Sequence, residues 1–371
     1  MHLRYPSTIA PRIAAAAALA ASLTAAAVVP LPARAATVFV VNSSGDDHDQ
    51  FRGDGICATA GGVCTLRAAI EEANAEGGAQ PITITFNIPG SGVQTIQISS
   101  PLTVTAGNLT IDGYTQPGAA PNTAPLIDNA QIMVEVKGQG PTYDGFVLIS
   151  RHNTVRGLAI YDVFRPFYLD GPNSDYNRLV GDFIGTNAAG TFAYGYQPGQ
   201  GVYNAHGVSL YNGPSYNQIG DVAPGDRNVI SGNGFKGICM ENVPTGGPTT
   251  SYNVIYNNII GLSPSGGPFP NTRYGNPDHG IDLNHGASYN VIGGTAPGQR
   301  NVISGNGQNG IEISHPMSTT NDYGNQIVGN YVGTDVTGSA AYTYTGNLLN
   351  GINVEDGAIS TTVADNVVGN N

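Results

Sequence analysis

Residues 227–233 read RNVISGN, and residues 300–306 repeat that phrase letter for letter. Around it, the segment 177–252 returns as 253–324 and, in part, as 325–371. Each copy also carries a Gly-aliphatic phrase, which reads HGVSL at 206, HGIDL at 279 and NGINV at 350. A long repeat of this kind predicts a solenoid, in which each unit buries its apolar face against its neighbours.

The repeat divides further into coils. The glycine of the Gly-aliphatic phrase recurs at spacings of 30, 43, 30 and 41 residues, at Gly207, Gly237, Gly280, Gly310 and Gly351. We therefore expect two coils per copy, a lean coil and one with an inserted loop. A lean coil holds three short apolar runs between turn residues, as in GVSLY (207–211), NQIGD (217–221) and NVISGN (228–233). Such runs are typical of strands, so the sequence predicts an all-β fold, a parallel β-helix with three strands per coil.

Glycine and asparagine dominate the predicted turns. The chain has 52 glycines in 371 residues and only 11% charged residues, which suits a fold with a tight turn at each corner. Asn228 and Asn301 occupy the same turn of successive copies, as do Asn233 and Asn306. Stacked asparagines can hydrogen-bond to one another along a solenoid axis, so we expect structural ladders and no catalytic role for them.

Residues 1–35 have the form of a signal peptide. Arg4 and Arg12 precede the apolar run 13–29, and Ala33-Arg34-Ala35 has the small-x-small form of a cleavage site. No other stretch is long and apolar enough for a membrane span. We expect a secreted protein, extracellular or periplasmic, with association to the cell surface left open.

The charge of the chain limits its partners. Without residues 1–35 it has 11 basic and 26 acidic residues, which argues against binding nucleic acid. Polyanionic glycans are also disfavoured, unless a cation such as Ca²⁺ bridges the two. The acidic stretch Asp46–Asp54 lacks the spacing of an EF-hand and is better interpreted as a solvated turn. We expect no cofactor, with Ca²⁺ as the open alternative.

Residues 36–80 are expected to form an N-terminal cap on a β-helix that occupies residues 81–371. Cys57 and Cys64 lie close together in an exported chain, which favours a local disulfide. Thr65 can cap a short helix over residues 66–75, which would cover the open end of the first coil. Cys239 is left without a partner, and we expect an inert thiol under a loop rather than a nucleophile.

Three stretches resemble a known group of proteins. The phrase CTLRAAIEEAN (64–74), preceded by GDGIC (53–57), is similar to the Cys-Ser-Leu-Arg-Glu-Ala type N-terminal motif of bacterial secreted β-helix proteins. GGTAPGQRNVISGNGQNGIEI (293–313) and VGNYVGTDVTGSA (328–340) resemble the repeats of the same proteins. This resemblance implies a right-handed, pectin-lyase-like β-helix, the hand that parallel crossovers generally favour. Pectate lyases, polygalacturonases, alginate-modifying enzymes and surface proteins of unknown activity share that fold, so it implies no single function. No catalytic residue can be transferred.

The register of the repeat predicts where a site would lie. In Gly-Ile-x-Ile the two aliphatic residues point inward, so x and the residue after the second aliphatic point outward. Aligning the coils predicts one outward column of Tyr168, Ser209, Cys239, Asp282, Glu312 and Asn353. A second column beside it holds Asp170, Tyr211, Glu241, Asn284, Ser314 and Glu355. Around the two columns lie His206, Lys236, His279, His285 and His315.

These columns define the candidate site on what we call the Gly-Ile face. Asp282, Glu312, Glu241 and His279 are the candidate catalytic residues. The candidate substrate-binding residues are Tyr168, Asp170, His206, Tyr211, Lys236, His285 and His315. The inserted loops 185–205, 261–278 and 333–350 precede the Gly-Ile strand and are expected to wall this groove.

The leading functional hypothesis is a secreted carbohydrate-active protein, a monomer that cleaves or modifies a neutral or weakly charged polysaccharide. Hydrolysis needs two carboxylates, about 5 Å apart for retention and about 6.5–9.5 Å apart for inversion. Asp282 with Glu312 on adjacent coils suits the first spacing, and Glu241 with Glu312 the second. A non-catalytic cell-surface, adhesion or glycan-binding protein is the first alternative. A polysaccharide lyase or epimerase, with His279 or His285 as base and a cation facing the substrate, is the second.

Overall fold

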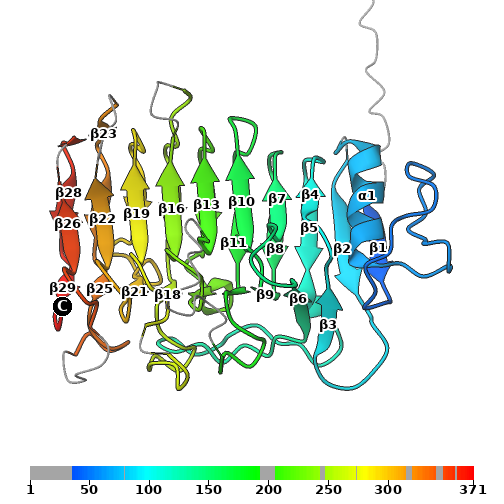
Figure 1. Ribbon diagram of the computed structural model, residues 1–371, viewed down its shortest axis with the longest axis horizontal. Coiled ribbons are helices and arrows are strands. Elements are labelled where there is room, and N and C mark those ends of the chain that lie inside the picture. The colour runs from blue at the N-terminus through cyan, green and yellow to red at the C-terminus, as the bar shows by residue number, and fades with distance from the viewer. Residues whose placement is uncertain are drawn as a thin grey trace, which may run out of the picture. The chain divides into compact units, whose positions relative to one another are not determined.

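The computed structural model describes residues 36–78, 80–192, 205–242, 247–272, 274–314, 320–339, 346–355 and 357–371. Residues 36–371 form one compact unit, in which short strands stack coil upon coil into three parallel sheets (Figure 1). Each coil except the first and the last contributes one strand to each sheet, which confirms the predicted parallel β-helix with three strands per coil. The expected signal segment 1–35 lies outside the described residues.

We name the three sheets A, B and C. Sheet A contains β1 (Thr37–Val41), β2 (Ile82–Phe86), β5 (Leu109–Asp112), β8 (Thr154–Arg156), β11 (Arg178–Val180), β14 (Gln218–Ile219), β17 (Val254–Ile255), β20 (Val291–Ile292), β24 (Gln326–Val328) and β28 (Thr362–Ala364). Sheet B contains β3 (Gln94–Gln97), β6 (Val134–Lys137), β9 (Ala159–Tyr161), β12 (Phe183–Ile184), β15 (Val229–Ile230), β18 (Ile259–Ile260), β21 (Val302–Ile303), β25 (Tyr331–Val332) and β29 (Val367–Val368).

Sheet C contains the Gly-Ile strands. They are β4 (Leu102–Val104), β7 (Phe146–Leu148), β10 (Phe167–Asp170), β13 (Val208–Tyr211), β16 (Ile238–Glu241), β19 (Ile281–Asn284), β22 (Ile311–Ser314) and β26 (Ile352–Val354). The remaining elements are α1 (Leu66–Glu76), the short 3-10 helices η1 (Gly113–Thr115) and η2 (Pro224–Asp226), and the strand pair β23 (Asp322–Tyr323) and β27 (Ala358–Ile359). None of the helices in these described ranges has the length and apolarity that a bilayer crossing requires.

The core is a stack of aliphatic side chains from all three sheets. In a coil of the repeat, Ile255 of sheet A, Ile260 of sheet B and Ile281 of sheet C are each fully buried. The same positions are aliphatic in the next coil, where Ile292, Ile303 and Ile311 are also fully buried. Because a strand alternates its side chains between two faces, one aliphatic residue in two is enough to fill the interior.

Buried asparagines form hydrogen-bonded ladders at the three corners of the solenoid. At the corner before sheet B, Asn228 donates to Asn258, Asn258 to Asn301 and Asn301 to Asn330, each through Nδ2–Oδ1 contacts of 2.9 Å. A second ladder between sheets B and C runs through Asn233, Asn276, Asn306 and Asn347. The third, before sheet A, runs through Asn217, Asn253, Asn290 and Asn325. The expected ladders therefore exist, and the intervening coils contribute to them as well.

The glycine of the Gly-Ile phrase is required by the close approach of neighbouring coils. A Cβ atom at Gly280 would lie 2.6 Å from the carbonyl oxygen of Gly310 and 2.8 Å from Nδ2 of Asn306. Gly237 and Gly310 meet the carbonyl oxygen of the next glycine in the same way. The recurring glycine thus lets the chain pass directly over the asparagine ladder.

An exposed stack of rings runs outside the corner that leads into sheet A. Tyr176, Tyr216, Tyr252 and Tyr289 stack in succession with centroids 5.0, 5.1 and 5.3 Å apart. Each residue precedes a ladder asparagine and has a positive φ of 57–59°. A positive φ is unusual for so large a side chain, and ring stacking offsets part of its cost. This column was not predicted from the sequence.

The N-terminal cap covers the first coil with α1, which lies beside β1 and β2 (Figure 1). Thr65 caps the helix, as expected, and accepts a hydrogen bond from the backbone N–H of Ala68. Cys57 and Cys64 form the expected disulfide. One expectation changes: β1, within the predicted cap, pairs in parallel with β2 and so belongs to the solenoid.

The acidic stretch 46–54 is not the solvated turn that we expected. Asp46 forms an ion pair with the buried Arg67, with Nε and Oδ1 2.9 Å apart. Asp49 is buried and accepts hydrogen bonds from the backbone N–H groups of Phe51 and Ala58. These carboxylates hold the cap loop, because its backbone donors have no strand partners.

The inserted loops also differ from expectation. The outward side chains of β12, β15, β18 and β21 in sheet B are apolar, and the described parts of the loops pack on them. Ala188 contacts the cluster of Phe183 and Val229, whereas Leu262 packs with Ile259 and Val302. The described parts of the loops therefore cover these strands of sheet B, whereas the prediction placed the loops along the Gly-Ile face.

Removing a ladder asparagine should destabilise the fold strongly. Asn301 donates to Ile255 and Asn330 and accepts from the backbone N–H of Asn258. We expect Asn301→Ala to lower the free energy of unfolding by about 3–5 kcal/mol, since several buried polar groups lose their partners. Urea denaturation checks this, with the exposed Asn173→Ala as control. Equal effects of the two variants would contradict a supporting role for the ladder.

Asp182 provides a complementary test, because its carboxylate lies at a corner position where later coils have a ladder asparagine. Its Oδ1 accepts from Leu158 N–H, but its buried Oδ2 has no partner, and burial raises its pKa well above the usual range. A raised pKa means that the native state holds a proton the unfolded chain releases, so stability falls as the pH rises above about 4.

We expect Asp182→Asn to raise the free energy of unfolding by about 1–3 kcal/mol at neutral to mildly alkaline pH. At acidic pH the gain should be much smaller, since the wild-type side chain is then protonated in both states. Urea denaturation at the two pH values measures the difference. A gain that does not depend on pH would show that the unpaired carboxylate is not its cause.

Candidate functional site

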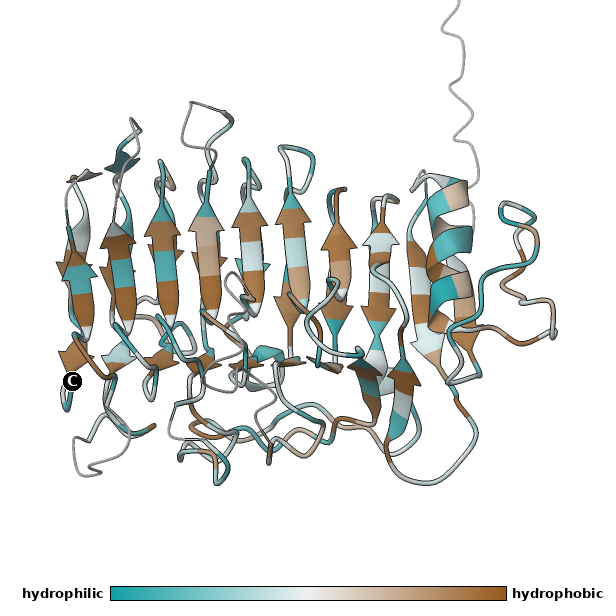
Figure 2. Ribbon diagram, in the orientation of Figure 1, coloured by the Kyte–Doolittle hydropathy of each residue, from teal (hydrophilic) through white to brown (hydrophobic). Residues whose placement is uncertain are grey.

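The outer face of sheet C carries both predicted columns in the predicted register. Tyr168 pairs with Ser209, Ser209 with Cys239, Cys239 with Asp282, Asp282 with Glu312 and Glu312 with Asn353. In the second column, Asp170 pairs with Tyr211 and Tyr211 with Glu241. Figure 2 shows the result as hydrophilic bands between hydrophobic bands on β19 and β22.

Facing outward does not make these residues exposed. Asp282 is only 1% exposed, and Cys239 and Glu312 are also buried. Side chains on neighbouring strands lie close enough to cover one another, because paired strands are about 4.8 Å apart. The open groove predicted from the sequence is therefore a tightly packed polar cluster with an accessible edge.

Lys236 lies over Asp282 at the centre of this cluster. Its ammonium contacts Oδ2 of Asp282, and the amide of Asn284 donates to the same oxygen. Burial opposes the charge of Lys236, but Cys239 and Asp282 together raise its pKa. Burial also raises the pKa of the Cys239 thiol, and the direct ion-pair contact of the ammonium is with Asp282. Lys236 thus acts here as a cation and not as a base.

Cys239 is a free, buried thiol. Its Sγ lies 3.8 Å from Oε2 of Glu241 and 3.9 Å from Oδ2 of Asp282. Burial, with smaller contributions from Asp282 and Glu241, raises the pKa of the Cys239 thiol although Lys236 lowers it, and this opposes formation of the thiolate, the nucleophilic form. The expected inert role of this thiol stays a prediction, and its burial is consistent with it.

Glu312 has a different environment from Asp282. Its two oxygens accept hydrogen bonds from the side-chain amides of Asn309, at 2.5 Å, and Asn353, at 3.3 Å. Burial raises the pKa of Glu312, and the bonds from Asn353 and Asn309 offset this only in part. Of the two neighbouring carboxylates, one is paired with an ammonium group and the other with neutral amides.

Two histidines adjoin the carboxylates. His285 Nδ1 lies 3.1 Å from Oε1 of Glu241, whose side chain is 32% exposed. His279 Nδ1 accepts from the backbone N–H of Asn309, so its Nε2 carries the proton when the ring is neutral. That nitrogen lies 3.4 Å from Oδ1 of Asp278, a buried residue that the sequence reasoning missed.

The predicted binding residues separate into accessible and buried groups. Tyr168, Asp170, Tyr211 and His285 are half-buried and line the accessible edge of the cluster. His206 is buried beside Phe235, and burial lowers its pKa well below the usual range, so it is a neutral packing residue. His315 lies outside the described residues.

Arg165 joins this edge and was not predicted. Its guanidinium lies 3.5 Å from the ring centroid of Tyr168 and forms a two-pronged ion pair with Asp144. Nothing in the repeat pattern pointed to Arg165, since it precedes the strand in a coil before the clear repeats begin.

The described residues contain no group of three or more histidine, cysteine or carboxylate side chains arranged to hold a metal ion. Within these ranges the site is therefore a set of protein carboxylates, imidazoles, an ammonium group and amides. Such a set can donate and accept protons and can hydrogen-bond sugar hydroxyls.

Comparisons with known proteins add little beyond the fold. No family model matches the chain, and no curated protein matches it significantly. Among solved structures, the chain is similar to the crystal structure of pectate lyase Pel9A, with 13% sequence identity and a TM-score of 0.25. The match covers 89% of this chain and 79% of that one. So loose a superposition carries no argument about activity.

The ion pair at the centre of the cluster can be tested directly. Lys236→Met should lower the free energy of unfolding by about 3–5 kcal/mol, because it leaves the buried carboxylate of Asp282 without a counter-charge. The double variant Lys236→Met/Asp282→Asn should recover most of this loss, as measured by urea denaturation. Equal instability of the single and double variants would mean that packing of the lysine stem, and not charge, stabilises this face.

Proposed function

We propose that this is a secreted protein that binds a neutral or weakly charged polysaccharide along the outer face of sheet C and hydrolyses it. One observation supports the proposal above the others: Asp282 and Glu312, on adjacent strands, have contrasting surroundings. Glycoside hydrolysis needs two carboxyl groups, one that holds a proton and one that stays ionised.

In this proposal Glu312 is the general acid. Its raised pKa favours a proton that it can donate to the glycosidic oxygen as the bond to the anomeric carbon breaks. Asp282, next to it and held beside Lys236, is the ionised partner for a retaining reaction at a strand spacing of about 4.8 Å.

Glu241 is the second candidate for the ionised partner. It is the most accessible of the three predicted catalytic carboxylates and contacts His285. It lies two strands from Glu312 and two residues further along the strand, so the two backbones are about 12 Å apart. The carboxyl groups come within the separation of about 6.5–9.5 Å that inverting enzymes need when the two side chains lean toward each other. Glu241 would then take a proton from that water as it attacks the anomeric carbon.

A non-catalytic role in glycan binding is the second candidate function, and the burial of Asp282 and Glu312 favours it. A ligand on this face would first meet Tyr168, Tyr211, Glu241 and His285. Aromatic rings beside carboxylates suit the apolar faces and hydroxyls of sugars. The predicted signal segment and the disulfide are consistent with work outside the cell.

The test is a panel of neutral and uronate-containing polysaccharides, assayed for new reducing ends and for the unsaturated products that β-elimination at a uronate gives. Glu312→Gln should lower kcat at least about 100-fold, the usual contribution of a general acid. The anomeric configuration of the wild-type product decides between the two ionised partners. If the configuration is retained and Asp282→Asn is inactive, Asp282 is the partner. If it is inverted and Glu241→Gln is inactive, Glu241 is the partner. The exposed Asp365→Asn is the matched control and should remain active.

Other outcomes of this experiment would support a different function. Unsaturated products would identify a lyase. Glycan binding without turnover, weakened by Tyr168→Ala and Tyr211→Ala, would support the binding role. Full activity of Glu312→Gln would exclude the assignment of that residue as general acid.

A further inference from the structure

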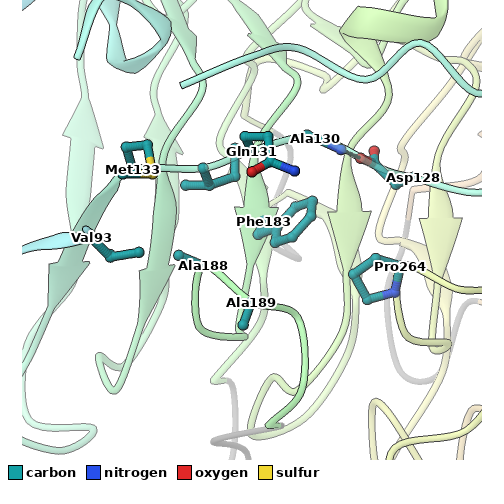
Figure 3. A pocket seen from close by; sticks show the side chains of 10 residues that line it. Val93, Asp128, Ala130, Gln131, Met133, Phe183, Ala188, Ala189 and Pro264 are labelled. Carbon is teal, nitrogen blue, oxygen red and sulfur yellow. Dashed lines mark hydrogen bonds between the residues drawn. The ribbon is translucent and has the colours of Figure 1, made fainter. Parts of the chain in front are cut away.

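A pocket on the outer face of sheet B has no place in the function proposed above. It has a volume of about 310 Å³, and its floor includes Phe183 of β12. Figure 3 shows Phe183 near the centre, Asp128 and Pro264 toward one end, and Val93 and Met133 toward the other. Four segments meet here: the residue before β3, the long connection between β5 and β6, the turn after β12 and the loop after β18.

The walls of the pocket are fixed by buried polar contacts. Arg227 is buried, and its guanidinium donates to the carbonyl oxygens of Ala124, Pro125 and Ile127 in the long connection. The backbone N–H of Asp128 donates to Pro264, at 2.8 Å, which joins that connection to the loop after β18.

The turn after β12 is held separately. The buried carboxylate of Glu135 accepts a hydrogen bond from the backbone N–H of Ala188, at 2.9 Å. Since the long connection, the turn after β12 and the loop after β18 are anchored, most of the cavity wall exists without a ligand, as in most small-molecule sites.

Asp128 is the unexplained group in this pocket. It is only 6% exposed, and its Oδ1 accepts from the backbone N–H of Ala130. Its Oδ2 is buried and has no hydrogen-bond partner. Burial raises the pKa of Asp128 to about 6, whereas Arg227 lowers it. The carboxylate is therefore largely ionised at neutral pH, and an unpaired buried anion costs free energy that a hydrogen-bond donor would recover.

We propose that this pocket binds a single neutral sugar ring, with a hydroxyl donating to the carboxylate of Asp128 and an apolar face against the hydrophobic lining. Because Oδ2 is closed to water in the free protein, the carboxylate turns toward the ligand when it binds. The volume lies at the lower end of the range for ligand pockets, about 300–1,000 Å³, which fits one ring and no longer glycan. Gln131, also in the lining, provides an amide for a second hydroxyl.

A neutral donor fits better than a cation, because Arg227 already places a positive charge near Asp128. An anion is opposed by Asp128 itself. The lining is otherwise apolar, with Val93, Ile132, Met133, Phe183 and Pro264 among its members. The inference does not rest on the function proposed for sheet C, since the pocket lies on a different sheet.

To test this proposal, the protein is titrated with a set of neutral methyl hexopyranosides, and binding is measured by calorimetry or NMR. Cyclohexylamine serves as a cationic probe of similar size. We expect at least one pyranoside to bind and the amine not to bind. Asp128→Asn should weaken that affinity at least tenfold while the melting temperature stays the same or rises, since the variant removes an unpaired buried anion.

Two further variants make the test specific. Ala189→Phe places a ring at the exposed edge of the pocket and should abolish binding without unfolding the protein. Asp365→Asn, far from the pocket lining, should bind normally. Failure of every pyranoside, preference for the amine, or binding unaffected by both Asp128→Asn and Ala189→Phe would overturn the proposal. Loss of catalysis or binding on sheet C would not bear on it.

Discussion

The buried asparagine ladders are the interaction on which the rest of the structure depends. Each amide both donates and accepts along the axis, so one coil fixes the position of the next at all three corners. The glycine of the Gly-Ile phrase makes this spacing possible, because a Cβ at Gly280 would clash with the next coil. Aliphatic residues then need only alternate along short strands to fill the interior. A carboxylate in the ladder, as at Asp182, loses the donor half of that pattern.

Because the interior positions are largely restricted to apolar residues, asparagine and glycine, the sheets differ mainly in their outward side chains. The outer faces of sheets B and C have opposite polarity. Sheet C presents acids, amides and histidines, which cover one another and bury Asp282 and Glu312. Strands β12, β15, β18 and β21 of sheet B present apolar side chains, and the described parts of the inserted loops pack on them. The same scaffold therefore carries a polar face suited to proton transfer and a loop-covered face that encloses a small cavity.

Both faces hold charge away from water, which costs stability unless the charge is compensated. Asp282 has the ammonium of Lys236, and Glu312 has two amides and a raised pKa. Asp128 has only a backbone N–H on one oxygen, with Arg227 acting at longer range. Carboxylates with raised pKa values, such as Glu312 and Asp128, occur at functional sites more often than elsewhere.

The sequence by itself determined the β-helix, the division into coils, the capping helix, the disulfide and the register that aligns Tyr168 through Asn353. These follow from local periodicity, in which a period of two sets the direction of each side chain. Only the tertiary structure decided that Asp282 and Cys239 are buried, that the loops cover sheet B, and that Asp128 meets Phe183 in a pocket. Burial depends on neighbours one coil or several coils away, and loop packing depends on which outer face is apolar. A single-strand pattern contains neither kind of information.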